Sequence, residues 1–195
     1  QKLDILETIG ITNINVENKY EITSSNMVYD RRLQKIYSKK ETTVKDISGN
    51  IYNSEDSFQF DLIKEIITTK KANVIDVDNN IYIFENAKIN LVSKEILGKE
   101  LKIDFVDNYF GIPNNDPILK GRSAISNNEE TKIYKTVFST CNTTNKSCPG
   151  WEIETEEFTH DKVNKVFNYK NSWLKLLDQE IFYFPFFSHP DPSVK

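Results

Sequence analysis

Residues 54–67 read Ser-Glu-Asp-Ser-Phe-Gln-Phe-Asp-Leu-Ile-Lys-Glu-Ile-Ile, and they fit two kinds of secondary structure. Phe58, Leu62 and Ile66 recur every four residues, as on one face of a helix. Phe58 and Phe60 also alternate with polar residues, and Asp61 opens a polar turn, as in two strands of a hairpin. A repeat elsewhere in the chain decides between the two.

The turn signal around Asp61 returns at a spacing of about 31 residues. The segments at this spacing are Val28-Tyr29-Asp30 leading to Lys35-Ile36 and Asn90-Leu91-Val92 leading to Lys94-Glu95-Ile96. A further copy lies much later in the chain, at Thr159-His160-Asp161 leading to Lys165-Val166. Each unit is an apolar strand end, a short polar turn and a basic residue that begins the next strand. Because a helix would not repeat a turn signal in its middle, the repeats predict stacked hairpins, as in a jelly roll, a sandwich or a β-solenoid.

The composition places the chain among globular proteins of one domain. It has 195 residues, of which 38% are hydrophobic and 28% charged. The net charge of −4 argues against a nucleic-acid binder, which normally carries a basic surplus. No apolar run approaches the roughly 18–20 residues of a membrane helix. These properties leave enzymes and binding modules open.

Alternation predicts which side chains share a buried face. Leu101 and Ile103 lie in phase, with Lys102 and Asp104 opposite. The predicted inner apolar strip contains Phe58, Phe60, Ile81, Ile83, Ile89, Leu91, Leu101, Ile103 and Phe105. Two open edges, which can recruit a strand from a partner, are predicted: the N-terminal strand that contains Tyr20, Ile22 and Val28, and the C-terminal strands before Pro185.

Two cysteines, Cys141 and Cys148, are separated by Asn-Thr-Thr-Asn-Lys-Ser. This spacing does not fit a CxxC zinc or redox site, and the chain has only two histidines. A local disulfide across a hairpin is the simplest interpretation, and it implies an oxidising compartment. Two free thiols in a reducing compartment are the alternative.

Known catalytic and metal-binding patterns are missing from the sequence. It has no glycine-rich phosphate loop, no GxSxG and no HExxH. His189-Pro190-Asp191 is formally an HxD motif, but only four residues follow it to supply a second histidine. His160 beside Asp161 is interpreted as a turn pair rather than a catalytic dyad. We therefore expect no enzymatic activity, no cofactor and no metal.

The C-terminal segment combines an aromatic strand with three prolines, Pro185, Pro190 and Pro192. Proline fixes φ and lacks an amide donor, so the strand is predicted to stop at Pro185 and to continue as a stiff exit. We expect a lead-in segment over residues 1–19, a β-domain over 20–184 and a proline-rich hinge over 185–195.

Several motifs of the second half resemble one family. Phe182–Lys195 is very similar to the segment that joins the periplasmic domain of the LptD family (also called OstA or Imp) to its outer-membrane β-barrel. The elements Val137-Phe138-Ser139-Thr140-Cys141 and Cys148-Pro149-Gly150-Trp151-Glu152-Ile153 look like the Thr-x-Cys … Trp-x-Ile element of that family. His160-Asp161 and Tyr169-Lys170-Asn171 are similar to the stretch of the family that lies C-terminal to this element.

This resemblance implies a fold, a ligand and partners. The fold would be an OstA-type antiparallel β-jelly roll, V-shaped in cross-section, with an apolar groove between its sheets. The groove would receive lipopolysaccharide from LptA, docked at an edge strand, and pass it to the barrel, which LptE plugs. The domain would lie on the periplasmic face of the outer membrane of a Gram-negative bacterium, with its signal peptide removed. The chain stops at Lys195, where the family continues into the barrel.

The resemblance also adds a second possibility for the cysteines. In some members of the family, a cysteine at the position of Cys141 bonds to one in the barrel, so a local and a long-range disulfide both stay open. The alternative function is a jelly-roll module that binds carbohydrate or protein. That module would have a closed core and exposed aromatic residues on an outer face.

Overall fold

The computed structural model describes residues 4–77, 79–104, 117–140, 150–191 and 194. Within these ranges the chain forms fifteen strands of one antiparallel sheet and contains no helix, hence no helix that could cross a membrane. The predicted all-β antiparallel fold is confirmed. The strands are β1 (Ile5–Glu7), β2 (Ile11–Val16), β3 (Tyr20–Ser25), β4 (Val28–Asp30), β5 (Lys35–Ser38), β6 (Thr42–Asp46), β7 (Ile51–Asp61), β8 (Ile66–Ile75), β9 (Ile81–Asn90), β10 (Glu95–Asp104), β11 (Pro117–Ser126), β12 (Glu130–Thr140), β13 (Trp151–Asp161), β14 (Val166–Leu176) and β15 (Gln179–Pro190).

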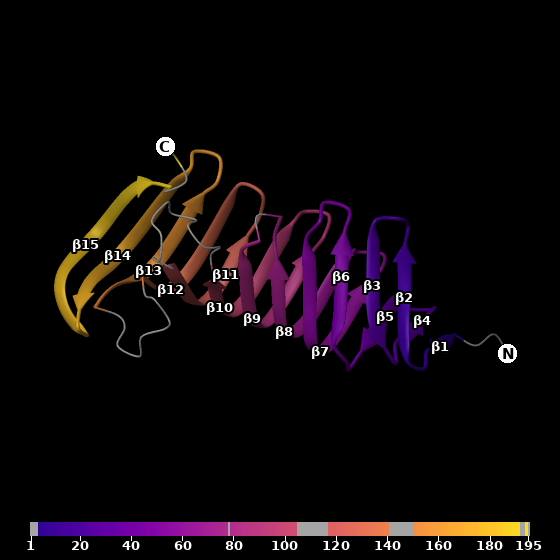
Figure 1. Cartoon of the computed structure of the whole chain (residues 1–195). Helices are drawn as coiled ribbons and strands as arrows, with labels where there is room; N and C mark the ends of the chain where they lie inside the picture. The colour runs from indigo at the N-terminus through magenta and orange to yellow at the C-terminus, as the bar shows by residue number, and fades with distance from the viewer. Residues whose placement is uncertain (1–3, 78, 105–116, 141–149, 192–193, 195) are drawn as a thin grey trace.

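The order of the strands follows the sequence over most of the sheet. From β7 to β15 each strand pairs with the next, and the hairpins stack along one direction (Figure 1). β7 is a branch point, because its first half pairs with β6 and its second half with β5. β3 and β2 follow β6, whereas β4 and β1 follow β5. The described strands therefore do not close into a barrel.

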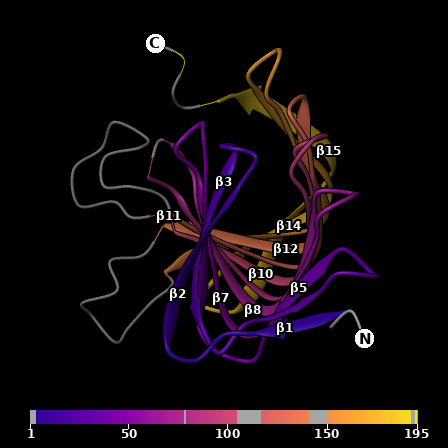
Figure 2. The same ribbon diagram turned by 90° about the vertical axis from the view of Figure 1, so that its right-hand side faces the viewer.

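The long strands bend near their middle, so the sheet folds back on itself into two wings (Figure 2). The first wing contains β2, β3, β6 and the strand halves 51–54, 72–75, 81–84, 101–104, 117–121, 136–140, 151–155, 172–176 and 179–184. The second wing contains β1, β4, β5 and the strand halves 58–61, 66–70, 87–90, 95–99, 123–126, 130–134, 157–161, 166–170 and 186–190.

Residues with positive φ mark the bend. They are Ser57 (φ 57°), Lys71 (49°), Glu100 (51°), Lys135 (53°) and Asn171 (52°), on β7, β8, β10, β12 and β14. Positive φ is uncommon for residues other than glycine. Here it occurs at the bend of five of the nine long strands, where it interrupts the ladder of backbone hydrogen bonds.

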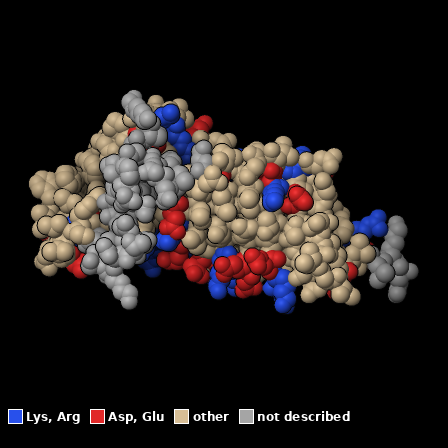
Figure 3. All heavy atoms as spheres, viewed as in Figure 1, with Lys and Arg blue, Asp and Glu red and all other residues tan. Residues whose placement is uncertain are grey.

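Both sides of the bend are polar. On the inside, buried hydroxyls satisfy the interrupted ladder: Thr155 Oγ1 donates to the carbonyl of Lys170 at 2.9 Å, and Ser172 Oγ donates to Thr155 Oγ1 at 2.8 Å. On the outside, charged side chains follow the bend along the lower border of Figure 3. Lys135 pairs there with Glu156 at 3.5 Å. This polar column separates the apolar halves of each strand.

The repeated turns lie where the sequence predicts them. Asp30, Asp61, Asn90 and Asp161 each end a strand, and their Oδ1 atoms accept backbone N–H groups of the following turn at 2.8–3.1 Å. Because β7 ends at Asp61 and β8 begins at Ile66, the hairpin interpretation of residues 54–67 is confirmed.

The predicted N-terminal edge is wrong. β3 lies between β2 and β6, and β4 lies between β1 and β5, so neither strand is open. Tyr20 and Ile22 are core residues, with exposed fractions of 7% and 0%, and Val28 pairs with both Glu7 and Tyr37. The expected lead-in segment supplies the two edge strands instead, because residues 11–16 alternate in burial and pair with β3.

The predicted end of the last strand at Pro185 is also wrong, because β15 runs through Pro185 to Pro190. β15 pairs only with β14, and proline is tolerated on such an edge strand. Pro185 falls in the bend, between the pairs Ser172–Phe184 and Lys170–Phe186, where the ladder is already interrupted. Pro192 lies outside the described residues.

Candidate functional site

The facing surfaces of the two wings form the apolar interior. Six predicted strip residues are buried there, with exposed fractions of 0–4%: Phe58, Phe60, Ile89, Leu91, Leu101 and Ile103. The inner surface of the first wing also contains Val74 and Phe84, and that of the second wing contains Ile67 and Phe158. The shared inner face was therefore predicted correctly for these six residues.

Two predicted strip residues, Ile81 and Ile83, point the other way. Ile83 is 36% exposed, whereas its neighbour Phe84 is 3% exposed. The bend of β9 between Phe84 and Ala87 shifts the alternation by one residue, so Ile83 cannot share a face with Ile89. Phe105, the last residue of the predicted strip, lies outside the described residues.

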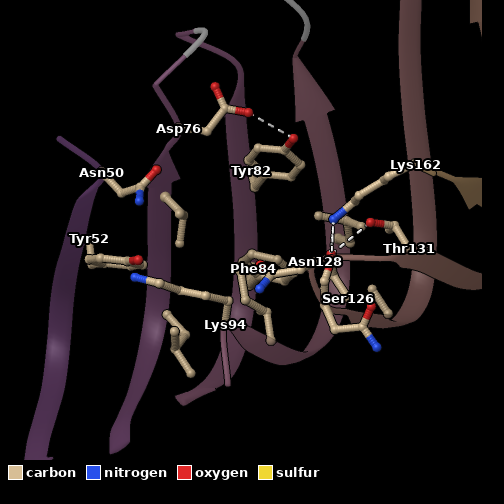
Figure 4. A pocket seen from close by; sticks show the side chains of 16 residues that line it. Asn50, Tyr52, Asp76, Tyr82, Phe84, Lys94, Ser126, Asn128, Thr131 and Lys162 are labelled. Atoms are coloured by element: carbon tan, nitrogen blue, oxygen red, sulfur yellow. Dashed lines mark hydrogen bonds between the residues drawn. The ribbon is translucent and has the colours of Figure 1, made fainter. Parts of the chain in front are cut away.

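The interior is not completely filled. A cavity of about 260 Å³ lies between the wings (Figure 4). Its apolar walls are Val74, Phe84, Ile89, Leu101 and Ala124, among others. A second cavity of about 250 Å³ continues toward the C-terminal end and shares Asp76, Tyr82, Thr131 and Lys162 with the first.

A third cavity opens at the N-terminal end of the sheet and has a volume of about 680 Å³. Its apolar lining comes from both branches: Leu6, Met27, Tyr29 and Ile36 from one side, and Ile14 and Val16 from the other. The branching of β7 therefore leaves an apolar hollow at the end of the wings.

The mouth of the groove is crossed by a charged contact between turns of opposite wings. Lys94, at the end of the β9–β10 turn, donates to Asp46 Oδ2 at 3.1 Å. Asp46 also accepts from the backbone and side chain of Asn50 and from the Tyr52 hydroxyl. Burial raises the pKa of the Asp46 carboxyl, but the hydrogen bonds from Asn50 and Lys94 outweigh it and hold the pKa below its usual value.

A similar contact lies nearer the N-terminal end. Glu65, which has the same place in its turn as Lys94, accepts from the Tyr20 hydroxyl at 2.5 Å and from Lys19 Nζ at 3.0 Å. These two donors lower the pKa of the Glu65 carboxyl. The repeated turn thus places a polar side chain across the mouth at two successive levels.

Lys162, in the β13–β14 turn, lies where the two central cavities meet. Its Nζ donates to Ser126 Oγ at 3.1 Å and to the carbonyl oxygen of Asn127. Burial lowers the pKa of the Lys162 ammonium, and the charge of Asp76 opposes this shift. Asp76 itself accepts from Asn80 and from the Tyr82 hydroxyl.

These mouth residues were not predicted from the sequence. One signal could have found part of them: the motif Asp-x-x-x-Asn-x-Tyr occurs at Asp46–Tyr52 and again at Asp76–Tyr82, thirty positions later. In both copies the aspartate accepts from the asparagine and the tyrosine. Lys94 and Lys162 gave no such signal, because only the folding of the sheet brings their turns to the mouth.

Aromatic side chains of β14 and β15 form a cluster at the C-terminal end of the sheet. Tyr169 stacks on Phe187 with ring centroids 4.2 Å apart. His160 contacts Asp191 at 2.8 Å rather than its neighbour Asp161, which caps the turn.

Among the described residues, no group of three His, Cys, Asp or Glu side chains could hold a metal ion. Cys141 and Cys148 lie outside the described residues, so their pairing stays a prediction.

No protein-family model matches the chain, and no curated protein matches it.

Proposed function

We propose that this chain is the periplasmic OstA-type jelly-roll domain of an LptD-family protein and that its groove carries the acyl chains of lipopolysaccharide. The observation that supports this proposal best is the apolar, incompletely filled interior between the wings, with polar side chains at its mouth. The C-terminal motifs support the proposed family. The apolar groove supports the proposed ligand, because acyl chains are apolar as well.

Lipid binding in such a groove needs no catalytic group. Each methylene moved from water into an apolar wall contributes roughly 0.8 kcal/mol, so a chain of several methylenes is held by burial alone. Because the affinity is spread along the chain, a lipid can slide from one cavity to the next without crossing one large barrier. The stacked cavities from Ile14 to Phe167 therefore suit transport along the sheet.

The ends of the sheet suit partners in this proposal. β1 and β2 are short edge strands beside the N-terminal cavity, and they would receive LptA by strand addition. At the other end, β15 exposes Ile181, Phe182 and Phe186. This apolar edge would face the outer-membrane barrel and LptE in the full-length protein.

The alternative function, a carbohydrate-binding jelly roll, has one observation in its favour. Trp173 and Tyr183 are 37% and 41% exposed, and their ring centroids lie 5.0 Å apart on neighbouring strands. Exposed aromatic pairs of this kind can stack on sugar rings. A carbohydrate-binding module of this kind is expected to have a closed core, which the interior cavities do not fit. We therefore prefer lipid binding.

Photo-crosslinking from two adjacent residues of β10 tests the proposed function. Ile96 lines the central cavity, and Leu97 points to the outer face of the same strand. A photoreactive phenylalanine is placed at either position, and the purified chain is irradiated with lipopolysaccharide. We expect a crosslink from position 96 and none, or much less, from position 97. Equal crosslinking from both positions, or a crosslink from position 97 alone, would contradict a lipid in the groove.

A further inference from the structure

The two lysines at the central cavity differ in how their charge is balanced. Lys94 contacts the carboxylate of Asp46, so its charge is neutralised within the protein. Lys162 donates to a serine hydroxyl and to a backbone carbonyl, which are both uncharged. Among the described residues, Lys162 forms no ion pair. The groups that accept its hydrogen bonds therefore do not balance its charge, and the nearby Asp76 carboxylate offsets that charge without a direct ion pair.

The surroundings of Lys162 contain few groups that could compensate this charge. Asp76 lies near enough to raise its pKa, but the Asp76 carboxylate accepts from Asn80 and Tyr82. On the other side, His160 has its pKa lowered by burial and contacts Asp191. The hydroxyl of Thr131 hydrogen-bonds to that of Ser126 at 2.7 Å. Beside Lys162 the cavities thus present the Asp76 carboxylate, which already accepts from Asn80 and Tyr82, and the neutral hydroxyls of Ser126 and Thr131.

The position of Lys162 between the two central cavities indicates which kind of ligand its ammonium could bind. It lines both central cavities, whose walls combine polar side chains with apolar ones: Phe84, Ile89 and Leu101 are apolar in one, and Leu119, Ile133 and Phe167 in the other. A ligand that extends from Lys162 along these apolar side chains would be apolar over most of its length and negatively charged at one end. Ionisable groups that burial perturbs are concentrated in the clefts of functional sites.

We propose that the Lys162 ammonium binds the acidic headgroup of an acyl amphiphile whose chain occupies the adjoining cavity. This inference rests on the proposed lipid-binding function and adds a determinant of specificity to it. The hydroxyls of Ser126 and Thr131 lie where they can donate to the same headgroup. Lys94 has a different role, since it joins the wings through Asp46.

Calorimetric titration of the full chain with two amphiphiles of equal chain length tests the proposal. Dodecyl phosphate has an acidic headgroup and dodecyl maltoside a neutral one, and both are used below their micellar concentrations. We expect dodecyl phosphate to bind roughly tenfold more tightly, which is the usual size of one charge-assisted hydrogen bond. Lys162→Met should remove this preference without weakening dodecyl maltoside, and Lys162→Arg should keep most of it.

Lys88→Met is the matched control, because Lys88 lies exposed on the outer face of β9 and its loss changes the net charge equally. It should leave the preference intact. If the two amphiphiles bind equally tightly to the wild type and to Lys162→Met, the inference about Lys162 is wrong, but lipid binding in the groove is supported. If neither amphiphile binds the wild type, both the inference and the proposed lipid-binding function are wrong. If inorganic phosphate alone binds as tightly as dodecyl phosphate, the site is one for a small anion and the inference is also wrong.

Discussion

At the scale of single residues, two glycines make room for core side chains. A methyl group on Gly98 would overlap the ring of Phe84, and one on Gly121 would overlap Ile133. We expect Gly98→Ala and Gly121→Ala each to lower the free energy of unfolding by about 1–3 kcal/mol, since overpacking a dense core forces side chains out of place. Gly150→Ala is the control, because nothing lies within 4 Å of the added methyl. Urea titration should separate the first two variants from the third, and three equal values would contradict this packing.

Asp46 should make the stability of the fold depend on pH. Its pKa is lower in the folded protein than in the unfolded chain, so protonation favours unfolding. Its contribution is therefore complete above the unfolded value of about 4 and is lost as the pH falls through the folded value.

We expect the free energy of unfolding to fall between pH 5 and pH 3, and to fall less in Asp46→Asn, which keeps the shape but cannot titrate. Glu65 also has a lowered pKa, so part of the fall should persist in that variant. Urea titrations at the two pH values measure the difference. The same fall in both proteins would mean that Asp46 does not contribute.

The limits of alternation also appear at this scale. Leu101 and Ile103 follow the bend of β10 and were placed correctly, because no interruption separates them. Ile83 and Ile89 stand on opposite sides of the bend of β9, which shifts the phase by one residue. A positive φ at a residue such as Lys71 or Glu100 leaves no mark in the residue type, so the sequence could not show where the inner face changes.

At the scale of strands and turns, local signals were reliable and long-range ones were not. The four turns that begin at Asp30, Asp61, Asn90 and Asp161 are fixed by side chains that cap their own backbone, so they could be predicted. Which strands lie at an edge depends on pairing between distant segments. The cavity mouth depends on the same pairing, because it joins turns such as those of Asp46 and Lys94 that are far apart in the chain.

The last strand should make the chain associate with itself. β15 is an edge strand of twelve residues, and Phe182 and Phe186 on it are 55% and 63% exposed. Long, apolar edges recruit another strand. We expect sedimentation velocity to show association that rises with concentration and that the double variant Phe182→Lys, Phe186→Lys largely abolishes. Ile63→Lys is the control, because Ile63 is even more exposed, at 75%, but lies in a turn. A wild-type chain that stays monomeric throughout would contradict the prediction.

At the scale of the whole molecule, the sheet resembles a one-dimensional stack. From β8 to β15, each strand has its backbone contacts with the strands before and after it in the order. In such stacks, stability is approximately a sum of local terms and contacts between neighbours, so a local defect does not unfold the distant end. A groove built this way can open at one level and stay closed at another, which suits a lipid that moves along it.

Hydrogen exchange of the full chain can test this independence of the two ends. Tyr169 on β14 and Ile22 on β3 are both buried, with exposed fractions of 1% and 0%, but they lie toward opposite ends of the sheet. We expect Tyr169→Ala to speed amide exchange in β13–β15 while β3 and β6 keep their protection, and Ile22→Ala to have the reverse effect. Each variant removes several contacts of a large core side chain, so the local effect should be severalfold or more. If either substitution speeds exchange uniformly over all strands, the sheet unfolds as one cooperative unit, and opening of the groove level by level would be ruled out.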